Sequence, residues 1–305
     1  MKRVCVTALL LWLLAPPAKA DMPTGAERRS DSMTIVDGSR GIAIQRDRSG
    51  RMRVPVFING RGPFSLIVDT GANGSAIGAH VADALGLSAE TSSEVILRGV
   101  TGSSRVAAVT VESLALGDVT TSHATLPIVL EALDGADGFL GTGAFTDKRV
   151  LIDFRRQRIA ISDSRPLNEG RGFIKVPADL SHARLVTVDT RVNGTAVKAI
   201  IDTGAGGSIG NSAMRNLLAG GRSVGRPDQI IGTSATVDYG QTYSMPPIAL
   251  GTLLIAGARV SFADVSIFAH FQLSAKPALL IGMDVLGQLD SMIIDYGAHE
   301  LQMRP

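Results

Sequence analysis

Cysteine is nearly absent from this chain, and the single one is Cys5. It lies in an apolar run close to the N-terminus, so we expect no disulfide, cysteine nucleophile or thiolate metal site in the rest of the protein. The five histidines are scattered without paired spacing, which argues against a metal centre. Phosphate-binding and dinucleotide-binding glycine motifs are also missing. We therefore predict neither a metal nor any other cofactor.

Long apolar runs are also scarce. The longest covers residues 4–15, after Lys2 and Arg3, and a small-residue cleavage motif ends at Ala20. A membrane anchor would need about 20 apolar residues, so this run predicts a cleaved signal peptide instead. We expect cleavage after Ala20, a flexible segment over 21–33, and export to the periplasm or the medium with no stable membrane insertion.

Charge of one sign is not in excess. The chain has 30 basic and 28 acidic residues, and the predicted leader, 1–20, holds three of the basic ones and no acidic one. The remaining chain therefore has 27 basic and 28 acidic residues. This balance gives no excess of positive charge that would indicate binding to nucleic acid or anionic lipid.

Aromatic residues make up 4 % of the chain, whereas glycine occurs 34 times. Short apolar runs separated by glycine and small polar residues predict many short strands. Two stretches have a helical pattern. One follows Ser75 and stops at Gly86, and the other runs from about Ser212 to Ala219, with Asn211 as N-cap and Gly220 as C-cap.

An internal repeat organises the chain. Four segments of the first half recur in the second at offsets between 131 and 142 residues. They are 41–44 with 172–175, 58–72 with 192–205, 139–141 with 280–282, and 151–154 with 293–296. A nearly constant offset indicates a duplicated domain. We therefore predict two lobes, at 34–163 and 164–305.

Each copy contains Asp-Thr-Gly-Ala after an apolar strand, at Asp69 and at Asp202, and a later apolar pair followed by Gly141 or Gly282. In these features the chain resembles the retropepsin-like aspartic proteases. The resemblance implies an all-β protein with two barrels related by a pseudo-two-fold axis, and Asp69 and Asp202 as catalytic residues. The active-site support it implies comes from the rest of the two motifs: Thr70, Gly71, Ala72, Thr203, Gly204 and Ala205.

The residue types fit peptide hydrolysis. Two carboxyl groups held close together cannot both ionise, so they share one proton. The ionised one takes a proton from water while the other protonates the peptide carbonyl oxygen. Both aspartates belong to one chain, so we expect a monomeric catalytic unit acting on a protein or peptide substrate.

The resemblance also implies a mobile flap over the substrate. Glycine-rich segments lie about 30 residues after each aspartate, at Gly99, Thr101 and Gly102 and at Gly232 and Thr233. An ordinary hairpin turn is the alternative interpretation of each segment.

Three further alternatives concern the function of the chain. Residues 206–210 match the G-x-S-x-G elbow of serine hydrolases, but that elbow belongs to an α/β fold. Asp153 and Asp295 end apolar runs without Thr-Gly, so we interpret them as structural. A non-catalytic binding or assembly module is the second candidate function.

The residue after each Asp-Thr-Gly bears on the pH range of activity. Ala72 and Ala205 supply no hydroxyl to the carboxylates, which predicts an optimum on the order of pH 5–7.

Overall fold

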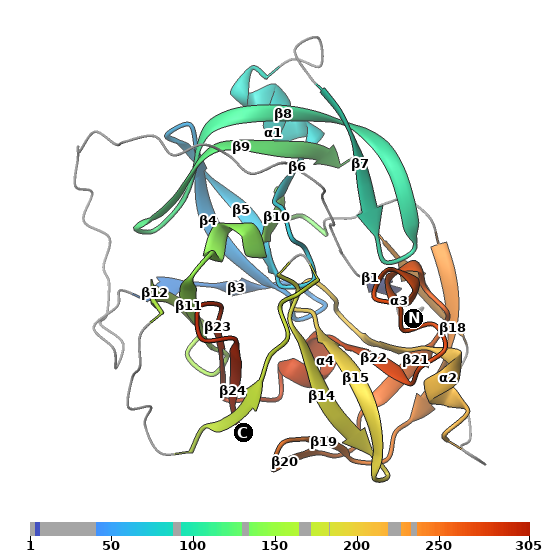
Figure 1. The fold of residues 1–305 in the computed structure, drawn as a ribbon. Coiled ribbons are helices and arrows are strands. Elements are labelled where there is room, and N and C mark those ends of the chain that lie inside the picture. Colours follow the sequence, from blue (N-terminus) through green and yellow to red (C-terminus); the bar gives the residue numbers. More distant parts are fainter. Residues whose placement is uncertain are drawn as a thin grey trace.

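The structure is a computed structural model, and it describes residues 4–6, 41–87, 93–129, 134–164, 172–182, 184–218, 227–232 and 237–305. The predicted flexible segment 21–33 and most of the predicted leader lie outside these residues. The fold is mainly β and has two lobes, as predicted, and strands of both lobes meet in a shared sheet (Figure 1).

The strands of the first half are short except for one long hairpin. They are β2 (Ile42–Ala43), β3 (Gln45–Arg46), β4 (Met52–Ile58), β5 (Arg61–Asp69), β6 (Ala76–Gly78), β7 (Ser93–Gly99), β8 (Gly102–Leu116), β9 (Val119–Val129), β10 (Gly138–Gly141), β11 (Lys148–Asp153) and β12 (Arg158–Asp163).

The strands of the second half repeat this arrangement with additional breaks. They are β13 (Ile174–Pro177), β14 (Thr187–Val192), β15 (Thr195–Ile201), β16 (Ser208–Gly210), β17 (Asp228–Ile231), β18 (Val237–Ser244), β19 (Ile248–Leu250), β20 (Leu253–Ile255), β21 (Arg259–Phe262), β22 (Ala278–Ile281), β23 (Ser291–Asp295) and β24 (Glu300–Arg304). Strand β1 (Val4–Val6), within the predicted leader, pairs with β17.

The sheet of lobe one closes on itself. Its order is β3-β4-β5-β10-β6-β9-β8-β7, and an additional pairing joins β4 to β8. Apolar residues that alternate along β4, such as Val54 and Val56, point into this barrel and are fully buried. The closed barrel predicted for this lobe is confirmed.

The sheet of lobe two closes in the same way with one break. Strand β19 pairs with β14 as β8 pairs with β4, whereas β18 pairs with β21. Strands β18 and β19 therefore correspond to the single strand β8. Pro246 and Pro247 separate them, because a proline has no N–H to donate to a ladder.

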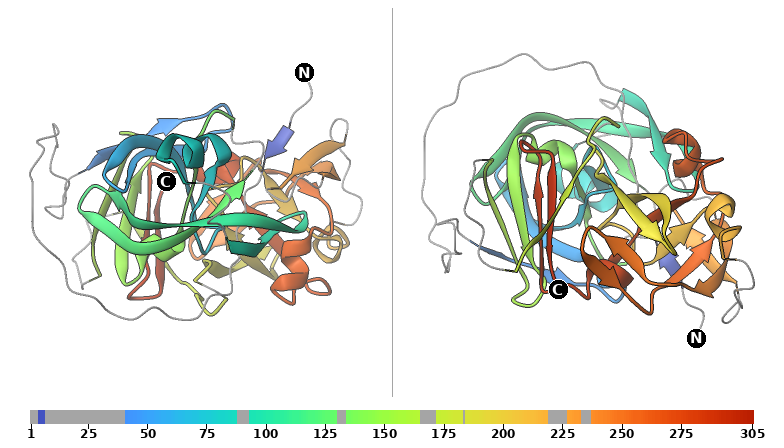
Figure 2. Two further views of the ribbon diagram at one scale, coloured as in Figure 1. Left: turned by 90° about the horizontal axis from the view of Figure 1, so that it is seen from above. Right: turned by 60° about the horizontal axis from the view of Figure 1, so that its bottom comes forward.

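A six-stranded sheet joins the lobes, in the order β13-β24-β23-β11-β12-β2. Its central pair is antiparallel, with Leu151 opposite Ile293, and these residues occupy equivalent positions in the two repeats. The pseudo-two-fold axis therefore passes between β11 and β23. Figure 2 shows this sheet beside the two barrels rather than between them.

Helices are few and short. They are α1 (Ala79–Leu85), α2 (Ser212–Arg215), α3 (Ser266–His270), α4 (Met283–Leu286) and the 3₁₀ turn η2 (Thr142–Phe145). No helix among the described residues is long and apolar enough to cross a membrane.

Two predictions about helices are confirmed and one is wrong. Helix α1 ends at Gly86, whose φ of 72° is left-handed, and the Asn211 side chain accepts a hydrogen bond from Met214 N–H at the start of α2. The prediction that α2 extends to Ala219 is wrong. The helix ends at Arg215, because the next backbone bonds, such as Leu218 N–H to Arg215, join residues only three apart. Ala219 itself and the predicted C-cap Gly220 lie outside the described residues.

Candidate active site

The two motif aspartates lie at equivalent places in the two lobes. Asp69 ends β5, and Asp202 directly follows β15. Strand β10 runs parallel to β5 and places Gly141 opposite Asp69, while β22 runs parallel to β15. Both aspartates are completely buried where the lobes meet. The repeat therefore brings its two carboxyl groups together, and we call this pair the dyad.

Two glycines let the chain cross beneath the aspartate loops. A Cβ atom on Gly141 would lie 2.3 Å from the carbonyl oxygen of Gly74, and one on Gly282 would lie 2.7 Å from that of Gly207. Such distances exclude any side chain at either position. Glycine at these two positions therefore allows the close crossing.

A serine ties each aspartate loop to the glycine beneath it. Ser75 Oγ accepts a hydrogen bond from Gly141 N–H at 3.1 Å, and Ser208 Oγ accepts one from Gly282 N–H at 3.0 Å. Ser208 also donates to the Asp284 carboxylate at 2.7 Å. The Ser208 hydroxyl thus accepts one hydrogen bond and donates another within this loop. This argues against a serine nucleophile in the G-x-S-x-G match.

Thr70 and Thr203 lock the two lobes together by a symmetric exchange. Thr70 Oγ1 accepts from Thr203 N–H at 3.0 Å, and Thr203 Oγ1 accepts from Thr70 N–H at 3.1 Å. Each hydroxyl then donates across the interface, Thr70 to the carbonyl of Ile201 at 2.8 Å and Thr203 to that of Val68 at 2.7 Å. All four bonds are buried, so the spacing of the dyad is fixed by backbone atoms next to it.

The two carboxyl groups are held by different numbers of backbone donors. Asp69 Oδ1 accepts one bond, from Gly71 N–H at 2.9 Å. Asp202 Oδ1 accepts two, from Gly204 N–H at 2.8 Å and Ala205 N–H at 3.0 Å. The Oδ2 atom of each aspartate has no hydrogen-bond partner among the described residues. These two oxygens are the ones left to act on a water molecule and a substrate.

Gly204 is required by the contact between the lobes. A Cβ atom at this position would lie 2.3–2.5 Å from the three carboxyl atoms of Asp69. The carboxyl group of one lobe therefore packs directly on the aspartate loop of the other. Any larger residue would push Asp69 away from Asp202.

The dyad titrates far from the usual range of carboxyl groups. Burial, followed by the charge of Asp202, raises the pKa of Asp69 well above its ordinary value. Burial also raises the pKa of Asp202, but the Gly204 and Ala205 N–H groups hold it to about 7. Asp202 therefore ionises first, and Asp69 keeps the shared proton.

Arg51 was not identified from the sequence. Its guanidinium is completely buried, and Nε lies 2.6 Å from Asp47 Oδ2. Its charge lowers the pKa of both Asp69 and Asp202. Nη1 and Nη2 have no partner among the described residues. A lone arginine before a strand carries no sequence signal of this role, since the placement depends on packing against lobe two.

The turn that carries Arg51 touches the aspartate loop of lobe two. Asp47 Oδ1 accepts bonds from Ser49 N–H and Arg51 N–H, both at 2.9 Å, which closes the turn. The Ser49 side chain lies 2.7 Å from where a Cβ on Gly206 would be. The buried cation is thus fixed at the junction of the lobes.

Asp153 and Asp295 are structural, as predicted. Asp153 accepts from Arg156 N–H at 2.7 Å, and Asp295 accepts from Ala298 N–H at 2.9 Å, so each closes a turn. Asp295 also pairs with Arg149 across the six-stranded sheet at 3.3 Å.

The first flap segment is the tip of the β7–β8 hairpin, and it reaches the other lobe. Gly99 pairs with Gly102, which leaves Val100 and Thr101 as a two-residue turn. Val100 is completely buried in an apolar cluster whose other members all come from lobe two, Ala205 and Ile267 among them. The hairpin therefore lies closed over the side of lobe two next to Asp202.

The second flap segment meets the first. A Cβ on Gly232, just after β17, would lie 2.4 Å from Thr101 Oγ1. Thr233 lies outside the described residues. The two glycine-rich segments predicted from the repeat are thus in contact, although only the hairpin of lobe one has its whole tip described.

The comparison with family models agrees with this geometry. The aspartyl protease model matches twice, over residues 54–144 and 188–285, which is one match for each copy of the motif. The chain belongs to the aspartyl protease family. The two matches support the two-lobed retropepsin-like fold. No curated protein matches the chain.

Proposed function

We propose that this family member is an aspartic endopeptidase, with Asp202 as the general base and Asp69 as the general acid. The observation that carries the proposal is the buried dyad, with both Oδ2 atoms free of protein partners and the lobes fixed by the Thr70–Thr203 exchange. The family model supports a protease of this type.

The different numbers of backbone N–H donors to the two carboxyl groups assign the acid and the base. Asp202 is the carboxylate, since two N–H groups stabilise its charge, and Asp69 carries the proton. Asp202 takes a proton from water as the water oxygen attacks the peptide carbonyl carbon. Asp69 at the same time gives its proton to the carbonyl oxygen. The C–N bond then breaks, Asp202 returns a proton to the amine, and Asp69 regains one from the hydroxyl that becomes the new carbonyl.

The closed hairpin sets a condition on substrate entry. Both aspartates are completely buried, and the hairpin tip at Val100 is seated in lobe two. A peptide reaches the dyad only after the tip has left that apolar cluster. Opening of the hairpin is therefore part of the proposed cycle, as for other lids over active sites.

The location of the protein and its oligomeric state are also proposals. The apolar run at 4–15 and the small-residue motif ending at Ala20 support export by a cleaved leader, to the periplasm or the medium. One dyad per chain supports a monomeric catalytic unit. N-terminal sequencing of the exported protein should begin at Asp21, and an uncleaved Met1 would contradict export by this route.

An unstructured protein substrate tests the activity. The exported chain should cut it into peptides, and a peptide that mimics the tetrahedral intermediate should inhibit competitively. Binding of the substrate without any cleavage would instead support the second candidate, a non-catalytic binding or assembly module.

A further inference from the structure

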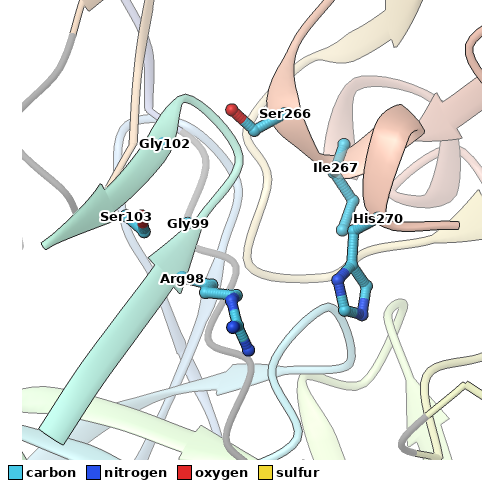
Figure 3. Close-up of a pocket in the computed structure, with 7 residues that line it drawn as sticks. All are labelled: Arg98, Gly99, Gly102, Ser103, Ser266, Ile267 and His270. Carbon is cyan, nitrogen blue, oxygen red and sulfur yellow. The ribbon is translucent and has the colours of Figure 1, made fainter.

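A hollow of about 260 Å³ lies beside the hairpin tip, between the β7–β8 hairpin and helix α3 (Figure 3). Arg98, Gly99, Gly102 and Ser103 line it from lobe one, and Ser266, Ile267 and His270 line it from lobe two. Small-molecule pockets are commonly about 300–1,000 Å³. The hollow is therefore of a size for one side chain of a longer ligand.

The hollow and the aspartate loop of lobe two border the same apolar cluster. Ile267, on its wall, belongs to the same apolar cluster as Val100 and Ala205. The Ala205 N–H group is one of the two donors to Asp202. We therefore expect a peptide that binds the dyad after the hairpin has opened to place a side chain near this hollow.

The charge of the hollow is positive. Its two ionisable side chains are Arg98 and His270, which Figure 3 shows facing one another across the space. The imidazole of His182 also acts on His270, whose pKa is lowered by partial burial, by Arg98 and by His182. Among the residues that the structure describes, no carboxyl group lines the hollow. In the described part of the chain, no ion pair is formed by Arg98.

Hydroxyl groups complete the lining. Ser103 lies directly opposite Arg98 in the hairpin ladder, so the two side chains share one face of the hairpin. Ser266 lies on the opposite wall, at the start of α3. A guanidinium binds a carboxylate through two parallel hydrogen bonds, and serine hydroxyls can donate to the remaining lone pairs.

We propose that this hollow is a subsite that selects an acidic side chain of the substrate, glutamate or aspartate, close to the bond that is cut. The inference rests on the proposed peptidase function and adds a substrate class to it. Arg98 is the specificity-determining residue, and Ser103, Ser266 and His270 contribute donors around the bound carboxylate.

Binding of peptides to the Asp69→Asn full-length chain tests the subsite without turnover. The probes are fluorescent peptides of one neutral sequence in which a single glutamine, glutamate or lysine is moved along the peptide. At one position, glutamate should bind at least about tenfold more tightly than glutamine, as a charged hydrogen-bonded pair permits. Arg98→Gln should abolish this preference, and Arg98→Glu should transfer it to lysine.

Arg105→Gln is the matched control. Arg105 lies on the same hairpin, with a side chain 75 % exposed and paired to Glu94 at 3.7 Å, and it does not line the hollow. This variant should keep the glutamate preference. Equal binding of glutamate and glutamine peptides at every position, or a preference that survives Arg98→Gln, would overturn the proposal.

Cleavage of the same peptides by the unsubstituted chain separates the two proposals. Peptides that are cut without any glutamate preference would overturn the subsite and leave the peptidase standing. Arg98-dependent binding of glutamate peptides that are never cut would leave the acidic site standing and overturn the peptidase.

Discussion

Thr70→Val removes the hydroxyl that joins the lobes while keeping the size of the side chain. In the structure this hydroxyl accepts from Thr203 N–H and donates to the Ile201 carbonyl, both in buried surroundings. The substitution leaves both groups without their partner. Each buried unsatisfied group costs about 1–3 kcal/mol, so the free energy of unfolding should fall by roughly 2–6 kcal/mol. That is a large part of the stability of an ordinary domain.

Activity should fall as well, because these bonds set the separation of Asp69 and Asp202. A displacement of about 1 Å in a catalytic group can cost about 10²-fold in rate. The assays are urea unfolding of the purified protein and kcat/KM on a peptide substrate. Thr70→Val should lose both stability and activity, whereas Thr70→Ser keeps the hydroxyl and should lose little of either.

Thr190→Val is a control for the loss of a threonine hydroxyl as such. Thr190 Oγ1 donates to the Ala249 carbonyl at 2.7 Å within lobe two, away from the dyad. It should cost stability but leave kcat/KM unchanged. If Thr70→Val kept the kcat/KM and the unfolding midpoint of Thr70→Ser, the exchange would not be what positions the dyad.

Three other predictions follow from the same site. The singly protonated dyad exists between the pKa of Asp202, about 7, and the higher pKa of Asp69, so the acidic limb of kcat/KM against pH should lie near neutral and the optimum above it. This range lies above the optimum on the order of pH 5–7 expected from the sequence, because burial raises the pKa of both carboxyl groups, and an acidic limb below about pH 4 would contradict it. Arg51→Gln combined with Asp47→Asn removes a cation that lowers both pKa values, so both limbs should move to higher pH, and a shift toward acid would refute the role of Arg51. Gly204→Ala should reduce kcat/KM by at least about 10²-fold, because its Cβ would occupy the space of the Asp69 carboxyl group, and near-normal turnover would show that the carboxyl has room to move.

The repeated parts of the site were predictable from the sequence. Asp69 and Asp202 stand in two copies of one motif, and a duplicated motif in one chain can form a two-fold site. The glycine crossings were also predictable, since Gly141 and Gly282 follow matching apolar pairs. The duplication indicates which two residues, far apart in the sequence, come together in the fold. A single copy of the motif does not indicate this.

Features outside the repeat were not predictable in the same way. Arg51 acts on the dyad through packing between the lobes, which no local pattern records. Val100 stands in a glycine-rich segment that also fits an ordinary hairpin turn. Its burial depends on contacts with lobe two, which the local sequence does not show. Helices α3 and α4 are too short to show a helical period, so they were missed.

The most direct test of the central claim compares Asp69→Asn, Asp202→Asn and the double variant in cleavage of an unstructured protein, with circular dichroism to confirm folding. Because the two carboxyl groups act as one unit, each single variant should lose about as much activity as the double variant. Near-normal turnover in either folded single variant would show that the two aspartates do not form a shared catalytic site.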